Sequence, residues 1–250
     1  FRPTFPKDEY EKEKDVIRHE IAMGLDDPDA VSSQLLFRTC YQRDNRRHPV
    51  IGHRDLFDAI TYDEMKVYHA AKYRPHNSFL VLSGDFDPTE AKSIIKRELA
   101  KGLRPPASFP IVAPAEPRQM GVRRASRSFA IPNTHLALTW QIPGLTHEDA
   151  PALDLLSVVL GGGRSSPLYR VIREEKSLVH SIGSYSWMPA DGPGIFSAYA
   201  EVEPENTKTV EEEILSQIEN LRSSDLTRPI ARAFRQIASQ QFKTLTTASG

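Results

Sequence analysis

The chain has 250 residues, and its 32 Lys and Arg nearly balance its 33 Asp and Glu, for a net charge of −1. That balance excludes the strongly basic surface by which many proteins bind nucleic acid. No run of about 18 apolar residues occurs, so we expect no membrane span. The length fits one large domain or two ordinary ones. Cys40 is the only cysteine, which excludes an intrachain disulfide, and its apolar neighbours favour a buried side chain over a nucleophile.

Residues 8–24 are predicted to form the first helix, because good helix formers dominate them and a glycine ends the stretch. One stripe of this helix follows the i, i+3, i+4, i+7 spacing, and it holds Glu13, Val16, Ile17 and Glu20. A stripe with valine and isoleucine is normally buried, and a buried carboxylate must be paired, hydrogen-bonded or bound to a metal. The alternative is a solvated helix face.

The rest of the first half predicts further helices and one strand. Thr61 and Glu64 form a capping-box pattern for a helix that ends near residue 73. The continuous apolar run at 78–85 is typical of a strand buried on both faces. Other helices are expected over 28–43 and from residue 87 onward.

Five prolines between residues 105 and 117 indicate a stiff, extended linker. We therefore expect a first domain at 1–103, a linker at 104–118 and a second domain at 119–250. Alternating polar and apolar residues predict strands in the second domain, and helical periodicity predicts helices. The strands are expected at 127–132, 134–142, 179–187 and 194–202, and the helices begin near 147, 168, 204 and 227.

The first helix resembles a segment of a known enzyme family. The sequence YEKEKDVIRHEIAMGLDDPD, residues 10–29, is similar to the segment that supplies the third zinc ligand of M16 (pitrilysin/insulinase-like) metallopeptidases. The resemblance implies that Glu20 is that ligand and that Glu13 is an acidic residue beside the catalytic site. The family's inverted motif, His-x-x-Glu-His, does not occur here, and the family places it upstream. We therefore expect this chain to be a piece of a longer protein.

The sequence HEDAPALDLLSVVLGGGRSSPLYRVIREEKSLVHSI, residues 147–182, resembles the second M16 domain. That resemblance implies that Arg173 and His180 hold the substrate backbone, with His180 in place of the more usual tyrosine. The turn formed by Gly161, Gly162 and Gly163 would line the substrate cavity. The alternatives are an ion pair of Arg173 with a neighbouring glutamate, a core or strand-face role for His180, and a simple helix stop at the glycines.

The family implies an α+β fold of two M16-type units, with mixed or antiparallel sheets flanked by helices, the first unit being incomplete. It also implies a zinc metalloendopeptidase that cleaves a peptide or unfolded polypeptide held between clamshell halves. Zn²⁺ would be held by two upstream histidines and Glu20, so the chain alone should be inactive and metal-free. The alternatives are a non-catalytic M16-like partner or scaffold and a peptide-binding subunit. A second M16 subunit or a second copy is the expected protein partner, and the sequence leaves periplasm, cytoplasm and organelle open.

Overall fold

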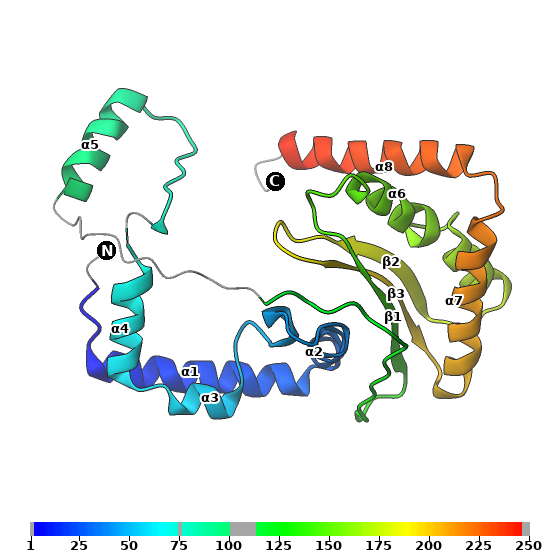
Figure 1. Ribbon diagram of the computed structural model, residues 1–250, viewed down its shortest axis with the longest axis horizontal. Coiled ribbons are helices and arrows are strands. Elements are labelled where there is room, and N and C mark those ends of the chain that lie inside the picture. The colour runs from blue at the N-terminus through cyan, green and yellow to red at the C-terminus, as the bar shows by residue number, and fades with distance from the viewer. Residues whose placement is uncertain (1–2, 75–76, 101–113, 247–250) are drawn as a thin grey trace. The chain divides into compact units, whose positions relative to one another are not determined.

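The computed structural model describes residues 3–74, 77–100 and 114–246, and it confirms an α+β fold (Figure 1). The chain groups into two compact units, residues 1–26 with 49–113 as unit 1 and residues 27–48 with 114–250 as unit 2. Residues 27–48 thus group with the second half of the chain. Most of the linker expected at 104–118 lies outside the described residues, so the division at that linker stays a prediction.

Unit 1 contains helices, which are α1 (Lys7–Asp26), α3 (Arg54–Ala59), α4 (Tyr62–Lys72) and α5 (Pro88–Ala100). Side chains tie α1 to the end of α3 and to the turn that follows it. Tyr10 Oη donates to the carbonyl of Ile60 at 2.9 Å, and Arg18 Nε donates to Asp58 Oδ1 at 2.7 Å. The expected capping box forms at the start of α4, where Thr61 accepts from the backbone N–H of Glu64.

The strand expected at 78–85 is wrong. Residues 78–83 have no regular secondary structure, and Phe79 and Val81 are 91% and 74% exposed. A strand is stable only when its backbone pairs with a neighbour, and the described residues of unit 1 contain no strand that could pair with this one. The apolar side chains of this run are therefore exposed to solvent.

Unit 2 is built on a three-stranded antiparallel sheet in the order β1-β3-β2. The strands are β1 (Thr134–Ile142), β2 (Ser181–Trp187) and β3 (Gly194–Val202). The helices are α2 (Pro28–Cys40), α6 (Ala150–Gly161), α7 (Thr207–Leu221) and α8 (Thr227–Thr246), with a π-helical segment η3 (Leu168–Glu175) and the single turns η1 (Asn45–Arg47) and η4 (Pro204–Asn206). Three of the four strands expected in this half are therefore present.

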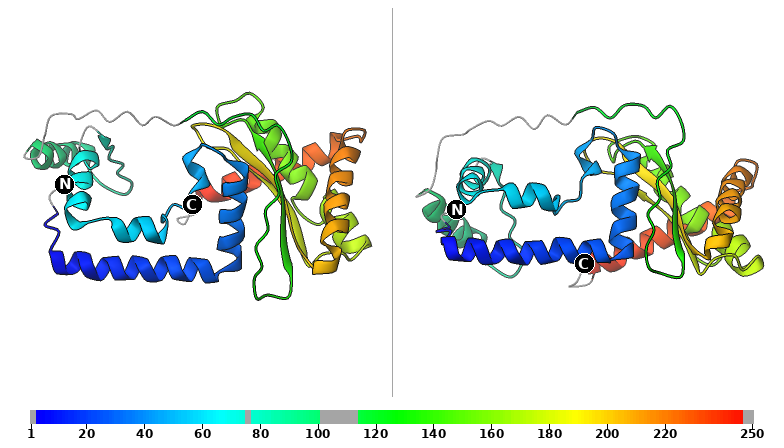
Figure 2. Two further views of the ribbon diagram at one scale, coloured as in Figure 1. Left: turned by 60° about the horizontal axis from the view of Figure 1, so that its bottom comes forward. Right: turned by 90° about the horizontal axis from the view of Figure 1, so that it is seen from below.

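The two faces of the sheet carry different side chains because successive residues of a strand point to opposite sides. One face presents Phe196, Ala198, Ala200 and Val202 of β3 to the main core, which also contains buried residues of α6, α7 and η3. The other face presents Ile195 to a smaller cluster with Cys40 and Tyr41, at the end of α2. Figure 2 shows α2 on one side of the sheet and α6, α7 and α8 on the other.

The strand expected at 127–132 is also wrong, because this segment pairs with none of the described strands and residues 130–132 form a bend. Side chains, not backbone bonds, hold the stretch before β1 in place. Glu116 accepts backbone N–H bonds from Gln42, Arg43 and Asp44 at 2.7, 2.8 and 2.9 Å. β1 consequently forms an edge of the sheet.

Candidate functional site

Helix α1 carries both carboxylates that the sequence singles out, and both are exposed. Within the described residues, the side chains of Glu13 and Glu20 form no hydrogen bond or ion pair, although their backbones belong to the helix. The expectation of a buried stripe is wrong, since Val16 is 55% exposed and Ile17 is only partly buried. The helix instead packs through the side that carries its tyrosine contact to Ile60, its ion pair to Asp58 and a buried isoleucine.

The described residues do not fit a zinc site by themselves. Catalytic zinc sites in proteins use three protein ligands from histidine, cysteine or carboxylate side chains. The described parts of the chain contain no group of three or more such side chains placed to hold a metal. Glu20 and Glu13 therefore offer carboxylates without the rest of a coordination sphere.

The glycine turn has a clear structural role. Gly161 ends α6 against β2, where a Cβ would come within 2.4 Å of the backbone nitrogen of Ser184. Gly163 has a φ of 120°, which lies in the region that only glycine adopts readily. The close approach and the turn both require glycine, so the helix-stop interpretation is sufficient to explain these two residues.

Arg173 lies on η3, and its guanidinium stacks on the ring of Tyr169. The guanidinium carbon lies 4.9 Å from the ring centroid, and Nη1 donates to Tyr169 Oη at 3.0 Å. An ion pair with Glu174 or Glu175 was the structural alternative, but Glu175 pairs with Arg170 instead. The stacked guanidinium is exposed and has further N–H donors.

His180 lies just before β2 at the end of the sheet. Its backbone N–H donates to the carbonyl of Glu201 at 2.8 Å, and Nε2 lies 2.9 Å from Glu203 Oε1. Its side chain is 50% exposed, so it is not a core histidine. Arg173 and His180 have different partners, and neither lines the pocket that lies along β1.

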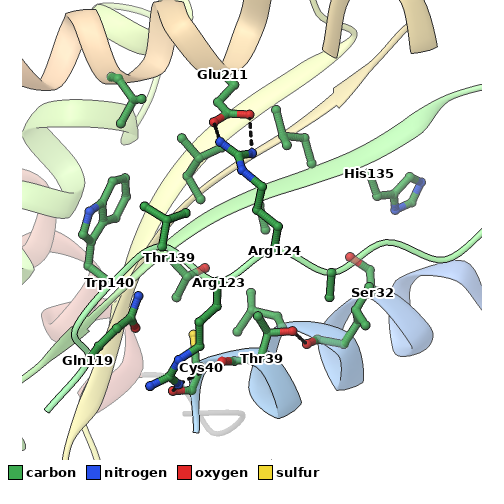
Figure 3. A pocket seen from close by; sticks show the side chains of 18 residues that line it. Ser32, Thr39, Cys40, Gln119, Arg123, Arg124, His135, Thr139, Trp140 and Glu211 are labelled. Atoms are coloured by element: carbon green, nitrogen blue, oxygen red, sulfur yellow. Dashed lines mark hydrogen bonds and ion pairs between the residues drawn. The ribbon is translucent and has the colours of Figure 1, made fainter. Parts of the chain in front are cut away.

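That pocket has a volume of about 370 Å³ and lies along β1 (Figure 3). Its lining comes from α2, from residues 119–125, from β1 and from α7. Cys40 is among the lining residues, and burial raises the pKa of its thiol to about 11. The side chain of Cys40 is 7% exposed, which confirms the expected burial, and its thiolate is scarce near neutral pH.

The two arginines of the pocket already have partners. Arg124 forms a bidentate ion pair with Glu211, at 2.8 and 2.5 Å. Arg123 donates to the carbonyls of Thr39 and Cys40 at the end of α2. Sequence reasoning missed this pocket because its lining comes from four separate stretches, and none of them carries a motif.

No helix in the described part of the chain is long and apolar enough to cross a membrane. Residues 59–229 match the family model described as the inactive domain of peptidase M16. The match begins after α1, so Glu13 and Glu20 lie outside the matched residues.

Known proteins of similar sequence and structure agree with this match. An uncharacterized zinc protease of Mycobacterium tuberculosis is 30% identical over 210 residues, which cover 79% of this chain and 45% of that protein. An uncharacterized zinc protease of Streptomyces coelicolor is 29% identical over 240 residues, which cover 92% of this chain and 51% of that protein. The crystal structure of a protease from Helicobacter pylori has the same fold, with a TM-score of 0.86 and a sequence identity of 23%. The match covers 98% of this chain and 60% of that protease. The chain spans about half the length of these curated relatives.

Proposed function

Because this chain belongs to the M16 peptidase family, we propose that it is part of a zinc metalloendopeptidase whose remaining part supplies most of the metal site. In this proposal Glu20 is a zinc ligand and Glu13 lies beside the site. The substrate is a peptide or unfolded polypeptide, held in extended form between two halves of a clamshell. The 250-residue chain alone is expected to hydrolyse no peptide.

The observation that carries the proposal is the exposed flank of α1. Glu13 and Glu20 lie seven residues apart on it, and neither has a partner within the described residues. A carboxylate must be ionised and uncommitted to bind a metal. Val16 and Met23 are 55% and 70% exposed on the same flank, so an element that covered it would also bury apolar surface. The names of the relatives as zinc proteases support this interpretation.

Substrate contacts are proposed in unit 2. The guanidinium of Arg173 has N–H groups that can donate to a peptide carbonyl while its ring contact to Tyr169 holds it in place. His180 would donate through the ring nitrogen that does not face Glu203. The glycine turn, Gly161 to Gly163, would allow the substrate backbone to approach closely.

A non-catalytic role is the second candidate, as a scaffold, an M16-like partner or a peptide-binding subunit. The family model that matches this chain is described as an inactive domain, and that observation favours such a role. A second M16-type subunit or a second copy of the chain would be its partner.

One experiment separates the two candidates. A protein extended to the length of the relatives is made with Glu20→Gln and, as a matched control, with Glu11→Gln on the opposite flank of α1. Bound zinc and peptide hydrolysis are measured for each. We expect Glu20→Gln to weaken zinc binding by at least about 100-fold, since changes in groups that only orient a ligand already cost 10–100-fold.

The control should match the unchanged protein in zinc content and rate. Full zinc content and full activity in Glu20→Gln would refute the proposed ligand. A protein that binds peptides without zinc or hydrolysis would support the non-catalytic candidate.

A further inference from the structure

His180 and Glu203 form a pair whose two members are both fixed by backbone hydrogen bonds. His180 comes directly before β2, and Glu203 comes directly after β3, the neighbouring strand. The ring nitrogen Nε2 lies 2.9 Å from Glu203 Oε1. The backbone N–H of His180 donates to the carbonyl of Glu201 at 2.8 Å, and the carbonyl of Glu203 accepts from the N–H of Asn206 at 2.9 Å. The contact between the two side chains therefore joins two anchored residues.

Within the described residues, Glu203 is the charged side chain that contacts the histidine ring. It occupies the position before the single turn η4, where a side chain commonly caps the turn, but its carboxylate makes no capping bond. It reaches across to His180 instead. Charged side chains of the adjoining elements have other partners: Lys176 pairs with Glu213, Glu201 accepts from Asn133, and Arg173 contacts Tyr169.

The carboxylate determines which ring nitrogen carries a proton. An ionised carboxylate has only acceptor oxygens, so Nε2 of His180 must hold a hydrogen to make this contact. A neutral imidazole has a single N–H. With that N–H committed to Glu203, Nδ1 of the neutral ring presents a lone pair, which accepts a hydrogen bond and donates none. Only the imidazolium, which has a proton on each nitrogen, donates through Nδ1.

We propose that Glu203 is a positioning residue that fixes the Nε2–H form of His180, so that His180 donates to a substrate carbonyl only as the imidazolium. This proposal rests on the substrate role proposed above for His180 and adds a pH dependence to it. Histidine ordinarily changes its charge between pH 5 and 8, so the peptide should be held more tightly at the acid end of this range. A tyrosine at this position would donate throughout the range, because its hydroxyl keeps its proton up to about pH 10.

A surface ion pair without a role in binding is the alternative. Both side chains are about half exposed, at 50% and 46%, so their attraction contributes little to stability. Such a pair would leave the form of the ring irrelevant to the substrate. The two interpretations therefore differ in the protonation of the ring and in its effect on substrate binding, and both are measurable.

The form of the ring is tested in the 250-residue chain by NMR of the imidazole nitrogens, at a pH where His180 is neutral. The signals of His180 are those that disappear in His180→Tyr. We expect a proton on Nε2 and none on Nδ1. In Glu203→Gln the side-chain amide can also donate, so the ring should become a mixture of both neutral forms. A proton on Nδ1 in the unmodified chain, or identical ring signals in it and in Glu203→Gln, would overturn the proposal.

The effect on binding is tested in a protein extended to the length of the relatives, by measuring KM and kcat for one peptide between pH 5 and 8. The net contribution of one hydrogen bond corresponds to a factor of about 2–10 in affinity. We expect KM to rise by that factor toward pH 8, relative to His180→Tyr, while kcat keeps the same pH profile. Glu203→Gln should lower KM at pH 8 by a similar factor, because its neutral ring can donate through Nδ1. The control Glu205→Gln removes an equal charge from η4 and should leave KM unchanged.

The outcomes distinguish this proposal from the proposed function. Peptide hydrolysis with the same pH profile of KM in every variant would overturn the role of Glu203 and leave the peptidase intact. A KM that rises in Glu203→Gln at pH 8 would also overturn it, because the pair would then only hold the ring in place. Absence of hydrolysis at every pH would refute the proposed function and, with it, the substrate contact of His180, while the NMR result still decides the form of the ring.

Discussion

The carboxylate of Glu116 is expected to be a major anchor of unit 2. Its two oxygens accept the backbone N–H groups of Gln42, Arg43 and Asp44, three consecutive residues after α2. Burial alone would raise the pKa of this carboxyl. The three N–H bonds, with the charge of Arg123 nearby, outweigh burial and lower the pKa below its ordinary value of 4.5. Replacing Glu116 with glutamine tests how much this arrangement contributes.

The expected loss of stability follows from the number of hydrogen bonds that Glu116 accepts. A hydrogen bond to a charged group contributes about 1.5–3 kcal/mol and a neutral one about 1 kcal/mol. Glutamine keeps one acceptor oxygen, so at best two of the three bonds survive in neutral form. After a discount for the exposure of this side chain, we expect Glu116→Gln to lower the free energy of unfolding by about 1–2 kcal/mol.

Urea unfolding followed by tryptophan fluorescence measures this loss, because both tryptophans, Trp140 and Trp187, belong to unit 2. At a slope of about 2 kcal/mol per M, the midpoint should fall by roughly 0.5–1 M. The control is Glu148→Gln, which removes an exposed carboxylate that has no partner in the described structure. This control should leave the midpoint unchanged.

The pH dependence has a definite sign. A carboxyl with a lowered folded-state pKa stabilises the fold above its unfolded pKa, and this contribution is lost as the pH falls through the folded-state pKa. The difference between Glu116→Gln and the unchanged chain should therefore hold from pH 7 to about 5 and shrink below pH 4.5. A difference that is absent at pH 7, or constant down to pH 3, would refute the reasoning.

Two further predictions concern packing. Gly161→Ala should lower the free energy of unfolding of unit 2 by about 1–3 kcal/mol, because the added Cβ would meet the backbone of Ser184. Gly24→Ala in α1 is the control, since its Cβ would enter open space and should raise helicity slightly. Thermal unfolding followed by circular dichroism compares the two variants, and equal effects would contradict the close approach at Gly161. Ile172→Ala should lower the free energy of unfolding by about 2–5 kcal/mol, because the isoleucine side chain is fully buried. Leu156 is 36% exposed, so Leu156→Ala should lower it by less than about 1.5 kcal/mol. Urea midpoints that fall equally for both variants would show that the core is misassigned.

The helices were predictable because their signals are local. The capping box of Thr61 and Glu64 and the stop at Gly161 each lie within a few residues, and the structure forms both. β1 was predictable from its alternation. The strands expected at 78–85 and 127–132 failed because a strand depends on a neighbour that the local sequence does not specify.

The candidate site residues show the same difference between local features, which were predictable, and packing, which was not. Placing Glu13 and Glu20 on one helix required only periodicity, and the structure puts both on α1. Their burial depends on what packs against that helix, and periodicity does not specify this. The pocket beside β1 was beyond prediction because segments from Ser32 to Leu215 meet there only after folding.

Unit 2 consists of two separate stretches of chain, 27–48 and 114–250, and this has a consequence for proteolysis. A cut anywhere between residues 49 and 113 breaks the covalent path between the stretches but none of the contacts that join them. Those contacts include the bond from Tyr41 Oη to the carbonyl of Pro193, at 2.8 Å, and the ion pair of Arg46 with Asp191. A nicked molecule should therefore migrate as one particle in gel filtration and as two bands under denaturing conditions. The two fragments on either side of such a cut, produced separately, should also associate. The N-terminal fragment would include α1, because α1 is covalently joined to α2.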